Sequence, residues 1–166
     1  MGNKRLRRYA LIAEIVSAAA VVVSLVFVAF QVQENTDAIR SATYDGILSD
    51  HIEWRMTVAT NFELAEAMSK VGSGDTEVSK VERENANDAG RALWQIYERA
   101  FFARKYETLG DSEWDRYERA ICRRAPLHDF DAEFERYLTS EFVEVAASCD
   151  PSECVRFFGD RCRVEP

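Results

Sequence analysis

Four cysteines carry the most reactive side chains of this sequence, and their spacing allows disulfide or metal chemistry. Cys149 and Cys154 stand in the segment CDPSEC, with Cys122 before them and Cys162 after them. An even number of cysteines favours disulfides in an oxidising compartment. The gaps of four and seven residues along the tail differ from the CxxC pairs typical of zinc sites. A four-thiolate zinc site and free buried thiols are the alternatives.

The local pattern of CDPSEC predicts which cysteines pair. Its aspartate is typical of a helix N-cap, its proline of the first helical position, and its glutamate of the third position in a capping box. Cys149 then precedes the cap and Cys154 takes the fourth helical position, two places whose side chains pack together as a hydrophobic staple. We therefore expect a Cys149 to Cys154 disulfide, which leaves Cys122 and Cys162 to pair, although four cysteines allow three pairings.

The rest of the sequence shows no catalytic pattern. The two histidines, His51 and His128, stand in no HExxH or similar ligand spacing, and no Walker loop, GxSxG or GxGxxG motif occurs. Both histidines are expected on the surface or inside a helical bundle. We therefore expect a protein that is not an enzyme and has no cofactor and no metal.

The segment from Ala10 to Phe30 is predicted to cross a membrane. Its 21 residues include only one glutamate and two serines as polar side chains, and as a helix they span roughly 31 Å, the thickness of a bilayer's hydrocarbon core. A cleaved signal peptide has a shorter apolar core of about 7 to 15 residues and a small-residue cleavage site. We therefore expect an uncleaved signal anchor over residues 9–32.

Positive charge at the two ends of the anchor predicts its orientation. Four of the 21 bases lie in residues 1–8, and only Arg40 lies in the fifteen residues after Phe30. Lysine and arginine are retained on the cytoplasmic side. Residues 1–8 are therefore expected to form a basic cytoplasmic tip in a plasma membrane, with the domain outside. In a bacterium with two membranes the domain lies in the periplasm.

Small residues recur along the anchor at spacings of 3, 4, 3 and 4: Ala10, Ala13, Ser17, Ala20 and Ser24. Such a stripe lets two helices approach closely, and serine hydroxyls can hydrogen-bond across the seam. It predicts a homo-oligomer associated through the anchor. Glu14 has two interpretations, because it can reach the cytoplasmic interface beside a basic residue or flank the seam and be shared between subunits. A channel is disfavoured because the outer half of the segment offers only one polar residue.

Beyond the anchor, helical periodicity predicts an all-α domain over residues 33–147, most simply an antiparallel bundle into which the anchor helix continues to about residue 60. Five apolar residues fall on one face of that continuation: Ile39, Ala42, Leu48, Ile52 and Met56. Further helices are predicted at residues 61–71, from 75 or 76 to 107, and at 111–125, 127–138 and 139–147. The aromatic residues within 94–106 favour core packing over a ligand platform. Residues 148–166 form a cysteine-containing tail.

The anchor sequence also resembles that of a known group. EIVSAAAVVVSLVFVAFQVQENTDAIR, residues 14–40, is similar to the N-terminus of a widespread group of uncharacterised bacterial single-pass membrane proteins. Their pattern is E-I-V-x-A-x-A-V-V-x-(S/T)-L-x-x-(L/V)-A-x-Q-(I/V)-x-x-N-T, followed by a small helical domain. The resemblance implies this architecture and no activity. The cysteine-containing tail of this chain departs from the group.

The charge balance of the domain restricts its partners. Beyond residue 8, 17 bases stand against 29 acids, and such a surface repels phosphate backbones, so nucleic acid is not an expected partner. We expect a membrane-anchored interaction and assembly protein whose partners are lipid, further copies of itself and another protein. A thiol-based redox or zinc-binding module that uses the four cysteines is the alternative.

Overall fold

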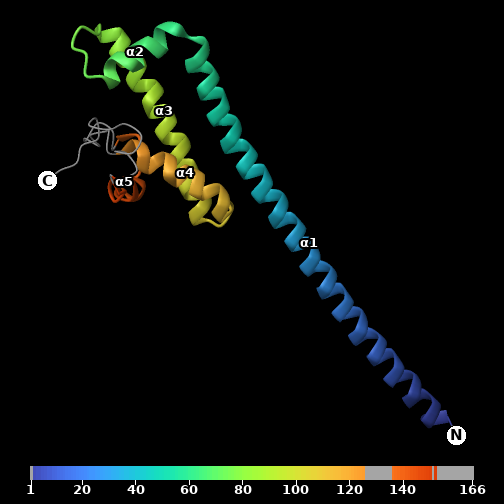
Figure 1. Cartoon of the computed structure of the whole chain (residues 1–166). Coiled ribbons are helices and arrows are strands. Elements are labelled where there is room, and N and C mark those ends of the chain that lie inside the picture. The colour runs from blue at the N-terminus through green and yellow to red at the C-terminus, as the bar shows by residue number, and fades with distance from the viewer. Residues whose placement is uncertain (1, 126–135, 151, 153–166) are drawn as a thin grey trace. The chain divides into compact units, whose positions relative to one another are not determined.

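The computed structural model describes residues 2–125, 136–150 and 152, with side chains described from residue 7 onward. Every regular element in these ranges is an α-helix, and none of these residues forms a strand. The helices, labelled in Figure 1, are α1 (Gly2–Thr60), α2 (Phe62–Gly72), α3 (Lys80–Lys105), α4 (Asp111–Arg124) and α5 (Ser140–Ala147). The predicted all-α class is confirmed, and the helix predicted at 127–138 lies mostly outside the described residues.

α1 is a single helix that passes through two compact units, Met1–Ser41 and Ala42–Pro166. No proline interrupts it, and Ser24, Thr36 and Thr57 donate their hydroxyls to carbonyl oxygens one turn earlier at 2.8 to 2.9 Å, within the helix. It ends where Asn61 takes an extended backbone and its side chain accepts from the Leu64 N–H, capping α2. The predicted continuation of the apolar helix to about residue 60 is confirmed.

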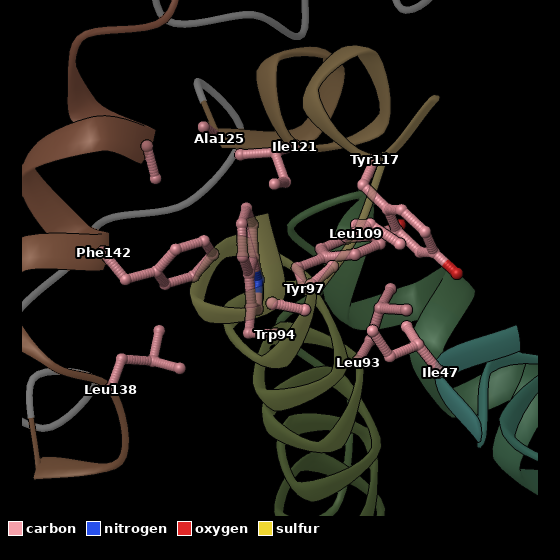
Figure 2. Close-up of a cluster of buried hydrophobic side chains, with 13 residues drawn as sticks. Ile47, Leu93, Trp94, Tyr97, Leu109, Tyr117, Ile121, Ala125, Leu138 and Phe142 are labelled. Carbon is pink, nitrogen blue, oxygen red and sulfur yellow. The ribbon is translucent and has the colours of Figure 1, made fainter. Parts of the chain in front are cut away.

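The second unit has one apolar core. Figure 2 shows Trp94 at its centre, with Phe142 of α5 on one side of the indole and Tyr97 on the other. The ring centroids of these two residues lie 6.2 and 5.6 Å from that of Trp94. The largest fully buried side chains are Trp94, Tyr97, Phe142, Ile47, Leu109 and Ile121. The preference for core packing is confirmed for Trp94 and Tyr97, whereas Tyr106 is exposed.

Contacts between α1 and α3 show that the two helices run antiparallel within the second unit. Asp50 forms an ion pair with Arg99, and one turn later the Trp54 indole N–H donates to the Ala89 carbonyl oxygen at 2.7 Å. The contact position thus moves backward along α3 as the chain advances along α1. α3 also packs against α2 and α4, so the predicted antiparallel bundle is confirmed.

The face of α1 that enters this core is not the one that carries the five apolar residues named above. Ile47 is fully buried, with Tyr44 and Trp54 packed beside it, whereas Leu48, Ile52 and other members of the predicted apolar face are exposed. The buried face is less apolar in sequence because tyrosine, histidine and tryptophan contribute their rings to it. The exposed apolar stripe is therefore available to another surface.

α3 begins at Lys80, four or five residues later than predicted, after a capping box formed by Ser79 and Glu82. Ser79 accepts from the Glu82 N–H at 3.2 Å, and the Glu82 carboxylate accepts from the Ser79 N–H at 2.9 Å. This capping box satisfies two backbone donors at once. The start predicted at residues 75 or 76 is wrong because the Ser79–Glu82 pair provides a complete cap, whereas the Asp75 carboxylate accepts from the Glu77 N–H in the loop before α3.

The C-terminus of α3 places a non-glycine residue in the left-handed region. Glu107 has φ 59°, its N–H donates to the Arg104 carbonyl, and the Thr108 N–H donates to the Ala103 carbonyl at 2.8 Å. These two bonds define a Schellman motif, in which the left-handed position is usually glycine. The chain thus reverses direction between α3 and α4 at Glu107, whose Cβ makes the left-handed backbone conformation unfavourable.

Replacing Glu107 with glycine is expected to raise the free energy of unfolding of the helical domain. The gain should be about 0.5 to 1 kcal/mol, because glycine takes φ > 0 without a Cβ clash while adding some unfolded-state entropy. Urea unfolding of the full chain in mild detergent measures it. Glu107→Ala is the control, since it also removes the side-chain interactions of Glu107 and keeps the Cβ. Equal behaviour of the two variants would contradict the prediction.

Candidate functional site

The N-terminal part of α1 is long and apolar enough to cross a membrane. Its large apolar side chains from Tyr9 to Val32 are each at least half exposed. No other helix among the described residues meets this criterion. The exposed stripe of small residues and the acid Glu14 both belong to this segment.

The predicted seam residues Ala10, Ala13, Ser17, Ala20 and Ser24 are all exposed in the first unit. The Ser24 hydroxyl donates to the Ala20 carbonyl oxygen at 2.8 Å, which satisfies its proton without a second helix. Its oxygen lone pairs stay available as acceptors. The seam therefore carries its close-packing surface intact, and association would depend more on that packing than on new hydrogen bonds.

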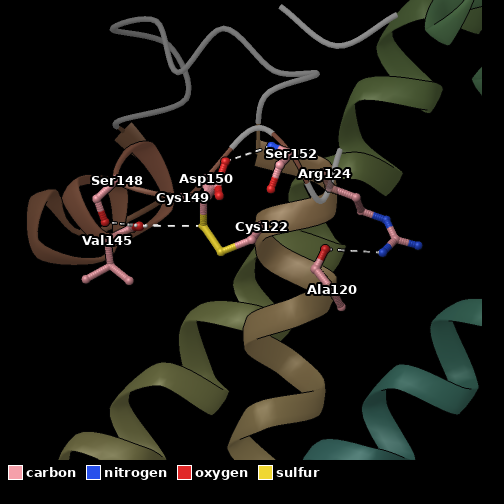
Figure 3. Close-up of a disulfide and its surroundings, with 8 residues drawn as sticks. All are labelled: Ala120, Cys122, Arg124, Val145, Ser148, Cys149, Asp150 and Ser152. Carbon is pink, nitrogen blue, oxygen red and sulfur yellow. Dashed lines mark hydrogen bonds between the residues drawn. A yellow bond between two sulfur atoms is a disulfide. The ribbon is translucent and has the colours of Figure 1, made fainter. Parts of the chain in front are cut away.

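The disulfide of the described residues joins Cys122 of α4 to Cys149, which follows α5 (Figure 3). Their Cα atoms lie 4.9 Å apart, within the usual range for a disulfide. The predicted pairing of Cys149 with Cys154 is therefore wrong, as is that of Cys122 with Cys162. Cys154 and Cys162 lie outside the described residues.

Cys149 pairs with Cys122 because of the way that α5 packs on the core. Phe142 and Ala146 of α5 are fully buried in the core that also holds Ile121 of α4. That packing brings the end of α5 beside the last turns of α4, where the half-buried Cys149 meets Cys122. A hydrophobic staple involves only residues close in sequence, so its pattern gives no information about a contact between α4 and the end of α5.

The predicted cap after Cys149 is present in part. The Asp150 carboxylate accepts from the Ser152 N–H at 2.8 Å, as an N-cap does. This hydrogen bond to the charged form lowers the pKa of Asp150. The cap and the disulfide are therefore compatible, because the cap orients the chain after Cys149 while the sulfur points to α4 (Figure 3).

His51 lies half-buried among aromatic rings, as a histidine inside a bundle does. Its ring centroid is 6.0 Å from that of Tyr97 and 6.3 Å from those of Trp54 and Tyr117. Burial lowers the pKa of His51, and the positive charges of Arg124 and Arg55 lower it further. The lowered pKa favours the neutral imidazole at neutral pH. His128 lies outside the described residues.

A groove separates the last turns of α1 from α3. Trp54, Val58, Leu64 and Ile96 form its apolar part, and the Asp50–Arg99 ion pair lies at one end. Its volume is about 500 Å³. This groove was not predicted from the sequence, although the alanines at positions 89 and 92 of α3 leave open space where larger side chains would fill the gap.

A second groove of about 510 Å³ lies between α2 and α3. Its lining combines apolar side chains such as Leu64 and Val81 with polar and acidic ones, among them Asn61 and Glu63 at the start of α2 and Glu82, Asn85 and Asp88 of α3. Leu64 and Ala89 line both grooves, so the two adjoin along α3.

Within the described residues, no group of three or more histidine, cysteine or acidic side chains is placed to hold a metal ion. Comparison with protein-family models, curated proteins and solved structures found no match to this chain.

Proposed function

We propose that this chain is a membrane-anchored helical interaction and assembly protein that self-associates through its anchor. The observation that carries the proposal is the run of exposed apolar side chains from Tyr9 to Val32 in α1, a surface that water disfavours and lipid accepts. The basic residues before it favour a cytoplasmic N-terminus. In a bacterium with two membranes the helical domain then faces the periplasm, and the resemblance of residues 14–40 implies the same single-pass architecture.

The disulfide supports an extracytoplasmic domain. Disulfides such as Cys122–Cys149 persist in oxidising compartments and are rare in the cytosol. While the bond is intact its two sulfurs are not free thiols, so a zinc-binding module would rely on Cys154 and Cys162, and a redox module would use either those thiols or the bond itself.

Self-association is supported by a second apolar stripe beyond the anchor. Leu48 and Ile52 are 36% and 52% exposed, and they follow Ala20 and Ser24 of the seam by 28 residues each, which is four heptads. Parallel helices anchored in one membrane present the same residues to each other. A homodimer with a left-handed supercoil would bury both stripes with one register.

Ser17→Leu or Ala20→Leu is expected to weaken the oligomer by about tenfold or more in dissociation constant, since a bulky side chain at the seam separates the helices by more than their packing tolerates. Analytical ultracentrifugation of the full chain in mild detergent measures it. Ala19→Leu is the matched control, because the same substitution lies off the seam and should leave association unchanged. A wild-type monomer, or equal effects at all three positions, would refute the seam.

A further inference from the structure

We propose that the two adjoining grooves form one docking trough for a basic, amphipathic helical segment of a partner protein. This inference rests on the proposed function as an interaction protein and specifies the chemistry of the partner. The trough is defined by the face of α3 that carries Glu82, Asn85, Ala89, Ala92, Ile96 and Arg99. α1 forms its opposite wall at one end, and α2 at the other.

The length of the trough favours a helical segment over a small molecule. Its α3 residues recur at spacings of three and four from Glu82 to Arg99, so they share one helix face over about 26 Å. A helix of that length has about 17 residues. Continuity is provided by Leu64 and Ala89, which line both grooves.

The walls provide apolar contact at fixed positions. Trp54 is held by its hydrogen bond to the Ala89 carbonyl, so its indole face is oriented before a partner arrives. Val58, Leu64 and Ile96 are partly exposed around it. A preoriented aromatic residue in an apolar groove is the usual anchor for the apolar face of a bound helix.

The charges of the trough specify the sign of the partner. Its lining includes five acids, Asp50, Glu53, Glu63, Glu82 and Asp88, and one base, Arg99. Asp50 neutralises Arg99, and Asp88 pairs with Arg91. Glu53 and Glu63 form no ion pair with any described residue, and both are exposed. Lysine or arginine flanking the apolar face of a bound helix would complement these carboxylates.

The test uses the full chain in nanodiscs of uncharged lipid and a fluorescent 18-residue peptide. The peptide has leucine at helical spacings of three and four and lysine elsewhere. Fluorescence anisotropy is expected to show saturable binding that weakens as salt rises. A peptide with glutamate in place of lysine should not bind, and empty nanodiscs measure binding to lipid alone.

Ala92→Lys is expected to weaken binding by about tenfold or more, because it fills the trough and places a like charge in it. Asn87→Lys is the matched control, since it adds the same charge to an exposed site of α3 outside the lining. Circular dichroism is used to check that both variants are folded. Equal weakening by the two variants, equal binding of the acidic peptide, or binding to empty nanodiscs only would overturn the proposal.

Failure of the docking proposal can be told apart from failure of the proposed function. The Ser17→Leu variant should lose self-association and keep peptide binding, because the trough lies entirely within the second unit. An oligomer that responds to Ser17→Leu while no peptide binds would retain the assembly function and remove the trough. If the wild-type chain is monomeric but binds the peptide, the trough is retained and the assembly function is removed.

Discussion

Removing the Cys122–Cys149 disulfide is expected to lower the free energy of unfolding of the helical domain by about 3 kcal/mol. The bond joins cysteines that are 27 positions apart in the sequence, and loop-closure entropy for such a separation corresponds to about 3 to 4 kcal/mol. The loss is large because the bond connects α4 to the end of α5, an eight-residue helix that would be marginal in isolation.

Urea unfolding of the full chain in mild detergent, followed by tryptophan fluorescence, measures this loss. The double variant Cys122→Ala, Cys149→Ala should be destabilised under non-reducing conditions, and reductant should change it less than it changes the wild type. Peptide mapping without reduction identifies the bond directly. A map that joins Cys149 to Cys154 would refute the pairing, and an unchanged free energy of unfolding would refute its stabilising role.

Features encoded by neighbours in sequence could be predicted. The uninterrupted apolar run and the absence of proline predict the long helix α1, because each residue needs only its own turn to satisfy its backbone. The periodicity around Leu93, Tyr97 and Ala100 predicts the buried face of α3, and all three are buried. The same local logic predicts that Asp150 accepts from a following backbone N–H.

Features that depend on which helices pack together could not be predicted. Cys122 meets Cys149 because α5 packs across α3 and α4, and no spacing within CDPSEC contains that information. Likewise, the stripe that contains Ile52 is the more apolar face of α1 in sequence, but Tyr44 and Trp54 are the residues that pack against the core, and Trp54 donates to the Ala89 carbonyl of α3. The trough could not be predicted either, because it forms only where α1 and α2 pack beside α3.

Phe142→Ala is expected to lower the free energy of unfolding of the helical domain by about 3 to 5 kcal/mol. Phe142 is fully buried, and its ring contacts Trp94 and Phe101 with centroids 6.2 and 5.7 Å apart. Truncation removes this apolar burial and leaves a cavity against Trp94. Phe62→Ala is the matched control, because Phe62 is 78% exposed and the same change there should alter stability by less than about 0.5 kcal/mol.

The Phe142 and disulfide effects should not add. Phe142 and Cys149 hold the same short helix α5, one through its buried face and the other through its C-terminal end. Once either is removed, α5 detaches more readily, so removing the second loses less. A double-mutant cycle with Phe142→Ala and the two cysteine substitutions should therefore show a combined loss at least about 0.5 kcal/mol smaller than the sum. Strict additivity would mean that α5 stays docked through its remaining contacts, such as the Lys105–Glu141 ion pair at 2.6 Å.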